Sequence, residues 1–147
     1  MAENHLVFKF EELLPYFGVG GEADVYEITP PGGAPTTIIR TDQAWKVRFH
    51  WRTYGKLNCV LCGKWNLRIY LEEMGKGEFD LPGATASVAF VSAPTDYEKD
   101  IVIPAGVVPE GIYKLVVSIT HTVPSGEPGP IAGFAEGPLL QFYKTCV

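Results

Sequence analysis

The chain has 147 residues, a length typical of one domain with a single hydrophobic core. Hydrophobic residues make up 46% of it and charged residues only 20%, which excludes the composition of disordered chains. The formal net charge of −5 argues against a nucleic-acid partner, since non-specific nucleic-acid binding depends on an overall basic field. No apolar run approaches the roughly 18 residues of a membrane span, and the N-terminus has no leader-like pattern. As written, the chain is therefore expected to be cytoplasmic, although a removed leader would leave no trace in it.

The N-terminal segment shows only a weak pattern. At most one short helix is expected there, over Phe10–Phe17, because a proline and a glycine limit it to about two turns. The glycines of Gly18–Gly21 predict a flexible connection. We therefore expect residues 1–22 to form an N-terminal extension to a single domain that spans residues 23–147.

Two segments in the first half alternate apolar and polar residues, which is the pattern of a half-buried strand. Gln43–Arg52 has an apolar face with two tryptophans and a basic opposite face, and Trp65–Leu71 repeats the alternation. The Pro- and Gly-rich segments 29–35 and 123–130 predict exposed loops. Further candidate strands are Leu6–Phe10, Asp24–Ile28, Thr36–Arg40, Thr85–Ser92, Asp100–Ile103, Ile112–Thr120 and Leu139–Thr145. Seven to nine strands predict an all-β fold, a single antiparallel β-sandwich with at most one short helix near the N-terminus.

A turn followed by a tyrosine lies in the second half of the chain. The segment Pro109–Tyr113 leads into an alternating strand. It resembles the corner before strand F of immunoglobulin-like and fibronectin-like domains. The resemblance implies that the Tyr113 hydroxyl donates to backbone just upstream while its ring fills the core. It also implies that Trp65 is the buried tryptophan of strand C, packed on the strand that contains Trp45. The expected fold is therefore an immunoglobulin-like sandwich, which by itself does not specify a function.

Charge is distributed unevenly along the chain. Between Gln43 and Tyr70 there are six Lys or Arg residues and no acid, whereas from Leu71 to Gly137 there are ten acids and three lysines. If the two strands of the first half are neighbours, their polar residues form one basic surface suited to an acidic partner, and their substitution should spare folding. The alternative is a solvated strand face whose charges discourage edge-to-edge pairing. The residues of this predicted binding face are Lys46, Arg48, His50, Arg52, Arg68 and Tyr70.

Patterns for metal binding and catalysis are incomplete. Cys59 and Cys62 have the spacing of half a zinc site, but there is no second pair and the histidines are scattered. We therefore expect no metal and no other cofactor. No nucleophile elbow or clustered Ser/His/Asp set indicates an enzyme. Carboxylates such as Glu78 and Asp80 would nevertheless suit a hydrolase that acts on a sugar.

The sequence thus predicts a non-catalytic binding or assembly module that contacts another protein through an exposed sheet face. Self-association belongs to the same hypothesis, because opposite charge in the two halves permits head-to-tail contacts. One alternative is a carbohydrate-binding, lectin-like domain, for which Tyr54 and Tyr70 are the exposed aromatic candidates. A carboxylate-based hydrolase is the second alternative.

Overall fold

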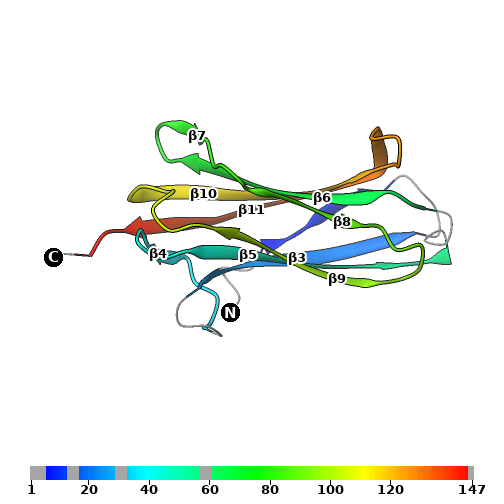
Figure 1. Ribbon diagram of the computed structural model, residues 1–147, viewed down its shortest axis with the longest axis horizontal. Coiled ribbons are helices and arrows are strands. Elements are labelled where there is room, and N and C mark those ends of the chain that lie inside the picture. The colour runs from blue at the N-terminus through cyan, green and yellow to red at the C-terminus, as the bar shows by residue number, and fades with distance from the viewer. Residues whose placement is uncertain (1–5, 13–16, 29–32, 57–60, 146–147) are drawn as a thin grey trace.

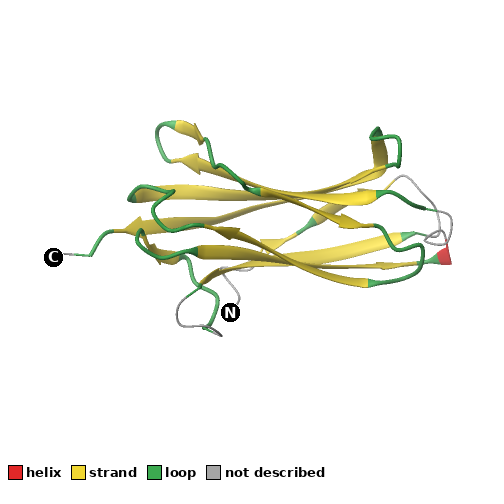
Figure 2. Cartoon of the chain, viewed as in Figure 1, coloured by secondary structure: helices red, strands yellow, loops and turns green. Residues whose placement is uncertain are grey.

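The computed structural model describes residues 6–12, 17–28, 33–56 and 61–145, which form two β-sheets packed face to face (Figure 1). Strands account for most of the described chain and run along the long axis of the molecule (Figure 2). The predicted all-β sandwich is confirmed.

The described residues form eleven strands. The count exceeds the predicted seven to nine for two reasons: the candidate strand Leu6–Phe10 is divided between β1 and β2, and β7 has only three residues, too few for an alternating pattern to be recognised. The strands are β1 (Leu6–Val7), β2 (Lys9–Glu12), β3 (Gly18–Glu27), β4 (Ile38–Arg40), β5 (Trp45–Tyr54), β6 (Lys64–Glu73), β7 (Gly77–Phe79), β8 (Thr85–Ala89), β9 (Asp96–Ile103), β10 (Gly111–Thr122) and β11 (Pro128–Tyr143).

The strand order is that of an immunoglobulin-like sandwich. The four-stranded sheet, here called sheet A, has the order β1-β3-β5-β9 and is antiparallel. The seven-stranded sheet, sheet B, has the order β2-β11-β10-β6-β7, with β8 antiparallel to β6 and β4 parallel to β11. The runs β3-β5-β9 and β11-β10-β6 reproduce the order of strands A-B-E and G-F-C in immunoglobulin-like domains.

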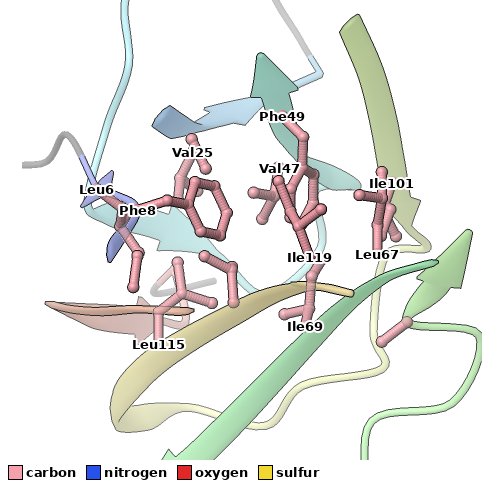
Figure 3. Packing of buried hydrophobic residues seen from close by; sticks show 14 of the residues in the cluster. Leu6, Phe8, Val25, Val47, Phe49, Leu67, Ile69, Ile101, Leu115 and Ile119 are labelled. Atoms are coloured by element: carbon pink, nitrogen blue, oxygen red, sulfur yellow. The ribbon is translucent and has the colours of Figure 1, made fainter. Parts of the chain in front are cut away.

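The core lies between the sheets and is built from the apolar faces of the long strands (Figure 3). The alternation predicted for the two segments of the first half is confirmed, because their inward side chains are at most 2% exposed. Burial of each such large side chain contributes about 1.5–3 kcal/mol to folding. These side chains are Trp45, Val47, Phe49 and Trp51 on β5 and Trp65, Leu67, Ile69 and Leu71 on β6.

The corner before β10 has the geometry that the resemblance implies. The fully buried Tyr113 donates its hydroxyl hydrogen to the backbone oxygen of Pro109 at 3.0 Å. Burial, with a smaller contribution from Glu73, raises the pKa of the Tyr113 phenol, so the group remains a hydrogen-bond donor at neutral pH. The indole of Trp65 packs edge-on against Trp51 of β5, with ring centroids 6.0 Å apart. Trp65 and Tyr113 thus occupy the positions expected for strands C and F.

The predicted N-terminal extension is instead part of the sandwich. β1 pairs with β3 in sheet A, and β2 pairs with β11 in sheet B, so the chain contributes to both layers before residue 13. The side chains of Leu6 and Phe8 are buried in the core. The predicted boundary after residue 22 therefore falls inside β3. At most one short helix was expected over Phe10–Phe17; residues 10–12 belong to β2, and residues 13–16 lie outside the described residues.

Two segments predicted as connections also differ in the structure. Gly18–Gly21 is the first part of β3 rather than a flexible link. Gly21 pairs with Trp51, and a Cβ atom at Gly21 would lie 2.6 Å from the Trp51 Cβ, so a larger residue would separate the two strands. Residues 128–130, predicted as loop, begin β11 opposite the end of β10.

Candidate binding surface

The polar face of β5 lies on the outside of sheet A between two acidic strands. The register places Arg48 between Asp24 on β3 and Asp100 on β9. Arg48 donates two hydrogen bonds to the Asp100 carboxylate, at 2.9 and 3.3 Å, and the Lys46 ammonium lies 3.3 Å from the same carboxylate. A single acid therefore neutralises much of the charge of two basic residues.

The same arrangement continues along β5. His50 Nδ1 lies 3.1 Å from Glu22 Oε1, and Arg52 Nε lies 3.4 Å from Asp96 Oδ1. Opposite charges that face each other across strands stabilise a sheet modestly. The basic residues of β5 are thus matched by acids of β3 and β9, and the charge segregation seen along the sequence becomes cross-strand pairing in the fold.

Asp100 is the centre of this network. Partial burial raises the pKa of its carboxyl group, but the hydrogen bonds from Arg48 and Lys46 together outweigh that effect, so the pKa lies below its ordinary value. The hydrogen bond to Asp100 in turn raises the pKa of Arg48. Both partners are charged at neutral pH, and each would have to give up this interaction before it could pair with a group on another protein.

The expectation that β5 and β6 are neighbours is wrong. β5 pairs with β3 and β9 in sheet A, whereas β6 pairs with β10, β7 and β8 in sheet B, on the opposite layer (Figure 1). The predicted binding face is therefore divided: its four β5 residues lie on sheet A, and Arg68 and Tyr70 lie on sheet B. The chain crosses between the layers after β5, which the alternation within each strand does not reveal.

A groove of about 740 Å³ lies on the outer face of sheet B, over β6, β8, β10 and β11. Its lining combines cationic, amide, hydroxyl and aromatic groups and includes no carboxylate. Its polar side chains include Lys64, Asn66, Arg68, Ser87, Ser118 and Thr120.

One row of sheet B shows how the groove is formed. The register aligns Phe134, Ser118, Arg68 and Thr85 across four adjacent strands. Ser118 is small and 5% exposed and forms the floor, whereas Phe134 on the next strand is 54% exposed. At about 4.8 Å between strands, the backbones of Phe134 and Arg68 are about 10 Å apart. The small side chain of Ser118 between the large side chains of Phe134 and Arg68 produces the hollow.

The cations of the groove differ from those of β5 because they have no acidic partner. Among the described residues, neither Lys64 nor Arg68 has a carboxylate within 4.0 Å. The Arg68 guanidinium lies 4.6 Å from the ring centre of Tyr70, an arrangement that favours the cation through the ring face. An adjoining hollow of about 220 Å³ includes Glu78 and Asp80 in its lining, but neither acid forms an ion pair with Arg68.

The sequence indicated only part of this groove. It identified Arg68 and Tyr70, and the same alternation could have added Lys64 and Asn66, which share their face of β6. Phe134 is far from Arg68 in the sequence, and only the pairing of β11 with β10 and of β10 with β6 brings the two residues close. The two aromatic residues of the carbohydrate alternative are not brought together, because Tyr54 lies on β5 in the other sheet.

A second hollow, of about 410 Å³, lies on sheet A and is a weaker candidate. Tyr26, Lys46 and Arg48 contribute to its lining. The two cations lie 5.7 and 5.3 Å from the Tyr26 ring centre and also contact Asp100. Groups already engaged in this way must give up interactions before they bind a ligand.

The pair Cys59 and Cys62, for which no metal was expected, is only partly described. Cys62 is an exposed free thiol, and Cys59 lies outside the described residues. His121 is buried, and its Nε2 lies 2.8 Å from the backbone oxygen of Cys62, which indicates a structural role. In the part of the chain that the structure covers, no group of three His, Cys, Asp or Glu residues could hold a metal. Within the same ranges, no helix has the length and apolarity to cross a bilayer.

Comparisons with known proteins find structures of similar shape and very different sequence. No protein family matches the chain, and no curated protein matches it. A CARDB domain from Pyrococcus furiosus, in complex with di-metal ions, is 9% identical over 90% of this chain and 98% of its own, with a TM-score of 0.47. A Niemann-Pick type C2 protein from Japanese carpenter ant is 8% identical over 92% and 99%, with a TM-score of 0.48. The PmoD soluble domain from a Methylocystis species is 12% identical over 90% and 97%, with a TM-score of 0.36. Likeness at this level carries no argument about function.

Proposed function

We propose that this domain is a non-catalytic binding module that holds an acidic surface of a protein partner in the groove of sheet B. The observation that carries the proposal is the contrast between two sets of cations. Those of β5 are matched by acids of the same chain, whereas Lys64 and Arg68 have no acidic partner among the described residues. Exposed, unmatched charge is available to a partner without loss of an internal ion pair.

The lining of the groove supports binding rather than catalysis. It contains hydroxyl, amide and cationic groups, but none of its residues is Asp, Glu, His or Cys. The hydroxyl groups of Ser87 and Ser118 therefore have no histidine or carboxylate within the lining to act as a general base. Glycoside hydrolysis uses two carboxyl groups on either side of the bond, a pair that the lining does not supply. We therefore favour a binding function over a carboxylate-based hydrolase.

A carbohydrate ligand is the second candidate. Phe134 is an exposed aromatic residue beside hydroxyl-bearing Ser118 and Thr120, which suits the apolar face and the hydroxyl groups of a sugar. The cations add a preference for acidic sugars. A protein partner remains the first candidate because the unmatched charge of Lys64 and Arg68 is the dominant feature of the groove.

The test compares proteins captured from the native host by three forms of the domain. These are the parent, the double variant Lys64→Glu/Arg68→Glu, and the control Lys99→Glu/Lys144→Glu, which changes the net charge equally but lies outside the groove lining. A partner retained by the parent and the control but lost with the groove variant supports the proposal. A partner retained equally by all three forms contradicts it.

Two further measurements separate the alternatives. A glycan array on which the parent binds acidic sugars, and the groove variant does not, would replace the protein partner by a carbohydrate. Measurement of mass in solution at several salt concentrations tests whether the partner is a second copy of the chain, because exposed charge pairs weaken as salt screens them within about 8 Å.

A further inference from the structure

We infer that the free edge of β8 accepts an extended acidic segment of the partner as an additional strand of sheet B. The inference rests on the proposed function, because it specifies how an acidic partner engages the groove. β8 pairs with β6 on one side, and no described residue pairs with its other side. An exposed sheet edge of this kind offers backbone hydrogen bonds to an incoming strand.

The hydrogen bonds between β8 and β6 determine which backbone groups remain free. Phe90 N–H donates to the Gly63 oxygen and Ile69 N–H donates to the Ala84 oxygen, both at 2.9 Å. Because antiparallel pairs alternate between hydrogen-bonded and non-hydrogen-bonded positions, residues 84, 86, 88 and 90 direct their backbone groups toward β6. Residues 85, 87 and 89 therefore direct their N–H and C=O groups toward the open edge.

The β8 edge lacks the usual features that discourage strand pairing. Its sequence, from Thr85 to Ala89, contains no charged residue and no proline. The edge strand of sheet A on the same side, β9, carries four charged residues among its eight. Charged side chains and proline are the common means by which proteins block an edge, and β8 has neither. Its short length limits the docked segment to about three to five residues.

The charge next to β8 specifies the chemistry of the incoming strand. Thr85 lies opposite Arg68, and Ala89 lies opposite Lys64. These small β8 side chains leave the two cations accessible from the edge, with Ser87 between them. An added strand would lie about 10 Å from β6, a distance that an extended Arg or Lys and a Glu side chain together span. The added strand therefore places carboxylates on the outer face of sheet B.

The spacing of the two cations also predicts a sequence pattern. Lys64 and Arg68 are four residues apart on one face of β6, which is about 13 Å in a strand. Carboxylates at positions i and i+4 of the added strand match this distance. The alternate residues would face the partly buried Ala86 and Val88, so they should be apolar. The predicted segment alternates acidic and apolar residues.

The test uses a labelled peptide of six residues in which Glu and Val alternate, and fluorescence anisotropy measures its binding at low salt. Three peptides are compared: the Glu-Val peptide, a Lys-Val peptide, and a Glu-Val peptide whose alternate backbone amides are N-methylated. Strand addition requires the first to bind, the second not to bind, and the third to bind about tenfold more weakly or not at all, since methylation removes the edge hydrogen bonds.

Variants of the protein test the same edge from the other side. Ser87→Pro removes an N–H that points away from β6, so the sheet keeps its internal hydrogen bonds while the edge is blocked. The expected result is loss of peptide binding, while the circular dichroism spectrum of Ser87→Pro matches that of the parent. On addition of the peptide, hydrogen exchange should slow at the amides of Thr85, Ser87 and Ala89.

The outcomes distinguish this inference from the proposed function. If N-methylation and Ser87→Pro leave binding unchanged while Lys64→Glu/Arg68→Glu abolishes it, the acidic ligand lies in the groove without strand addition, and only the present inference is overturned. Absence of binding by the Glu-Val peptide also overturns the inference. The proposed function then fails only if the partner captured from the host is insensitive to the groove variant.

Discussion

At the scale of single residues, the best-defined interaction of the fold is the hydrogen bond from the Tyr113 hydroxyl to the Pro109 oxygen, at 3.0 Å. The ring of Tyr113 contacts Phe79 and Phe142 edge-on, so the residue joins the turn before β10 to the core. A phenol is suited to this position because its apolar ring is buried while its polar end reaches the backbone.

Replacement of Tyr113 by Phe should lower the free energy of unfolding by about 1 kcal/mol, because the Pro109 oxygen loses its donor while the ring packing remains. Chemical denaturation measures the effect. Tyr70→Phe is the control, since the Tyr70 hydroxyl has no hydrogen bond among the described residues, and it should change little. Equal midpoints for parent and Tyr113→Phe would show that the corner hydrogen bond does not stabilise the fold.

Asp100 predicts a dependence of stability on pH. Its pKa is depressed in the folded protein, so the carboxylate contributes stability above the unfolded pKa of about 4 and loses that contribution as pH falls through the lower folded value. Asp100→Asn should therefore be less stable than the parent at pH 7, by about 1 kcal/mol or less for a partly exposed network. The difference should shrink below about pH 4.

Thermal unfolding of both proteins across this pH range provides the measurement. The control is Asp80→Asn, because Asp80 is exposed and forms no ion pair among the described residues. A stability difference between parent and Asp100→Asn that stays constant from pH 7 to about pH 2 would contradict the assignment.

At the scale of elements, the N-terminal strands determine how the two layers are joined. β1 and β2 are adjacent in the chain but belong to different sheets, so the segment crosses one side of the sandwich. The rings of Phe8 and Phe49 stack with centroids 6.0 Å apart, which packs this segment against the centre of sheet A. β1 and β2 each add an edge strand to a different sheet, so this segment stabilises both sheets, which a tethered extension would not do.

Deletion of residues 1–12 should therefore destabilise the domain. The loss of buried Leu6 and Phe8 alone corresponds to about 3–6 kcal/mol, comparable to the total stability of many small domains. Denaturation and hydrogen exchange of β3 and β11 measure the effect. Deletion of residues 1–5 is the matched control, and equal stability of the two shortened proteins would restore the view of residues 1–12 as an extension.

At the scale of the whole molecule, the two outer surfaces differ in how charge is used. Sheet A places basic β5 between acidic β3 and β9, so its charges stabilise the sheet from within. Sheet B leaves Lys64 and Arg68 unmatched beside a groove and an open edge. The first surface stabilises the fold, and the second is the surface that we propose binds a partner.

This difference predicts that two similar substitutions change stability by unequal amounts. Lys46→Glu/Arg48→Glu should lower stability by about 1–2 kcal/mol, because it places glutamates beside Asp100 and Asp24. The alternation of β5 alone predicts that the same change spares folding. Lys64→Glu/Arg68→Glu should lower stability by only about 0.5 kcal/mol, because no ion pair is lost and only the contact of Arg68 with the Tyr70 ring is removed. Urea denaturation measures the free energy of unfolding of both double variants. Equal decreases in this free energy would contradict the distinction between the two surfaces.

Much of the fold follows from local patterns. The alternation of β5 and β6 predicts their buried faces correctly, because a strand turns successive side chains to opposite sides whatever its neighbours are. The turn and tyrosine before β10 likewise predict the corner. The candidate strand Leu6–Phe10 is present but is divided between β1 and β2, which lie in different sheets, and a run of five residues does not indicate such a division. The candidate strand Asp24–Ile28 covers only the second half of β3, because Gly21 in the first half is required by close approach to Trp51 rather than by a turn.

The candidate site depended on pairing between strands. By itself the sequence determined the fold class, the inward residues of the long strands and the presence of six basic residues between Gln43 and Tyr70. Only the tertiary structure decided that Arg48 faces Asp100 while Arg68 faces Ser118 and Thr85, so that one cation is neutralised and the other is free. The physical reason is that the sequence of each strand shows which of its side chains face the core and which face solvent, whereas the assignment of strands to sheets depends on long-range burial and pairing across the whole chain.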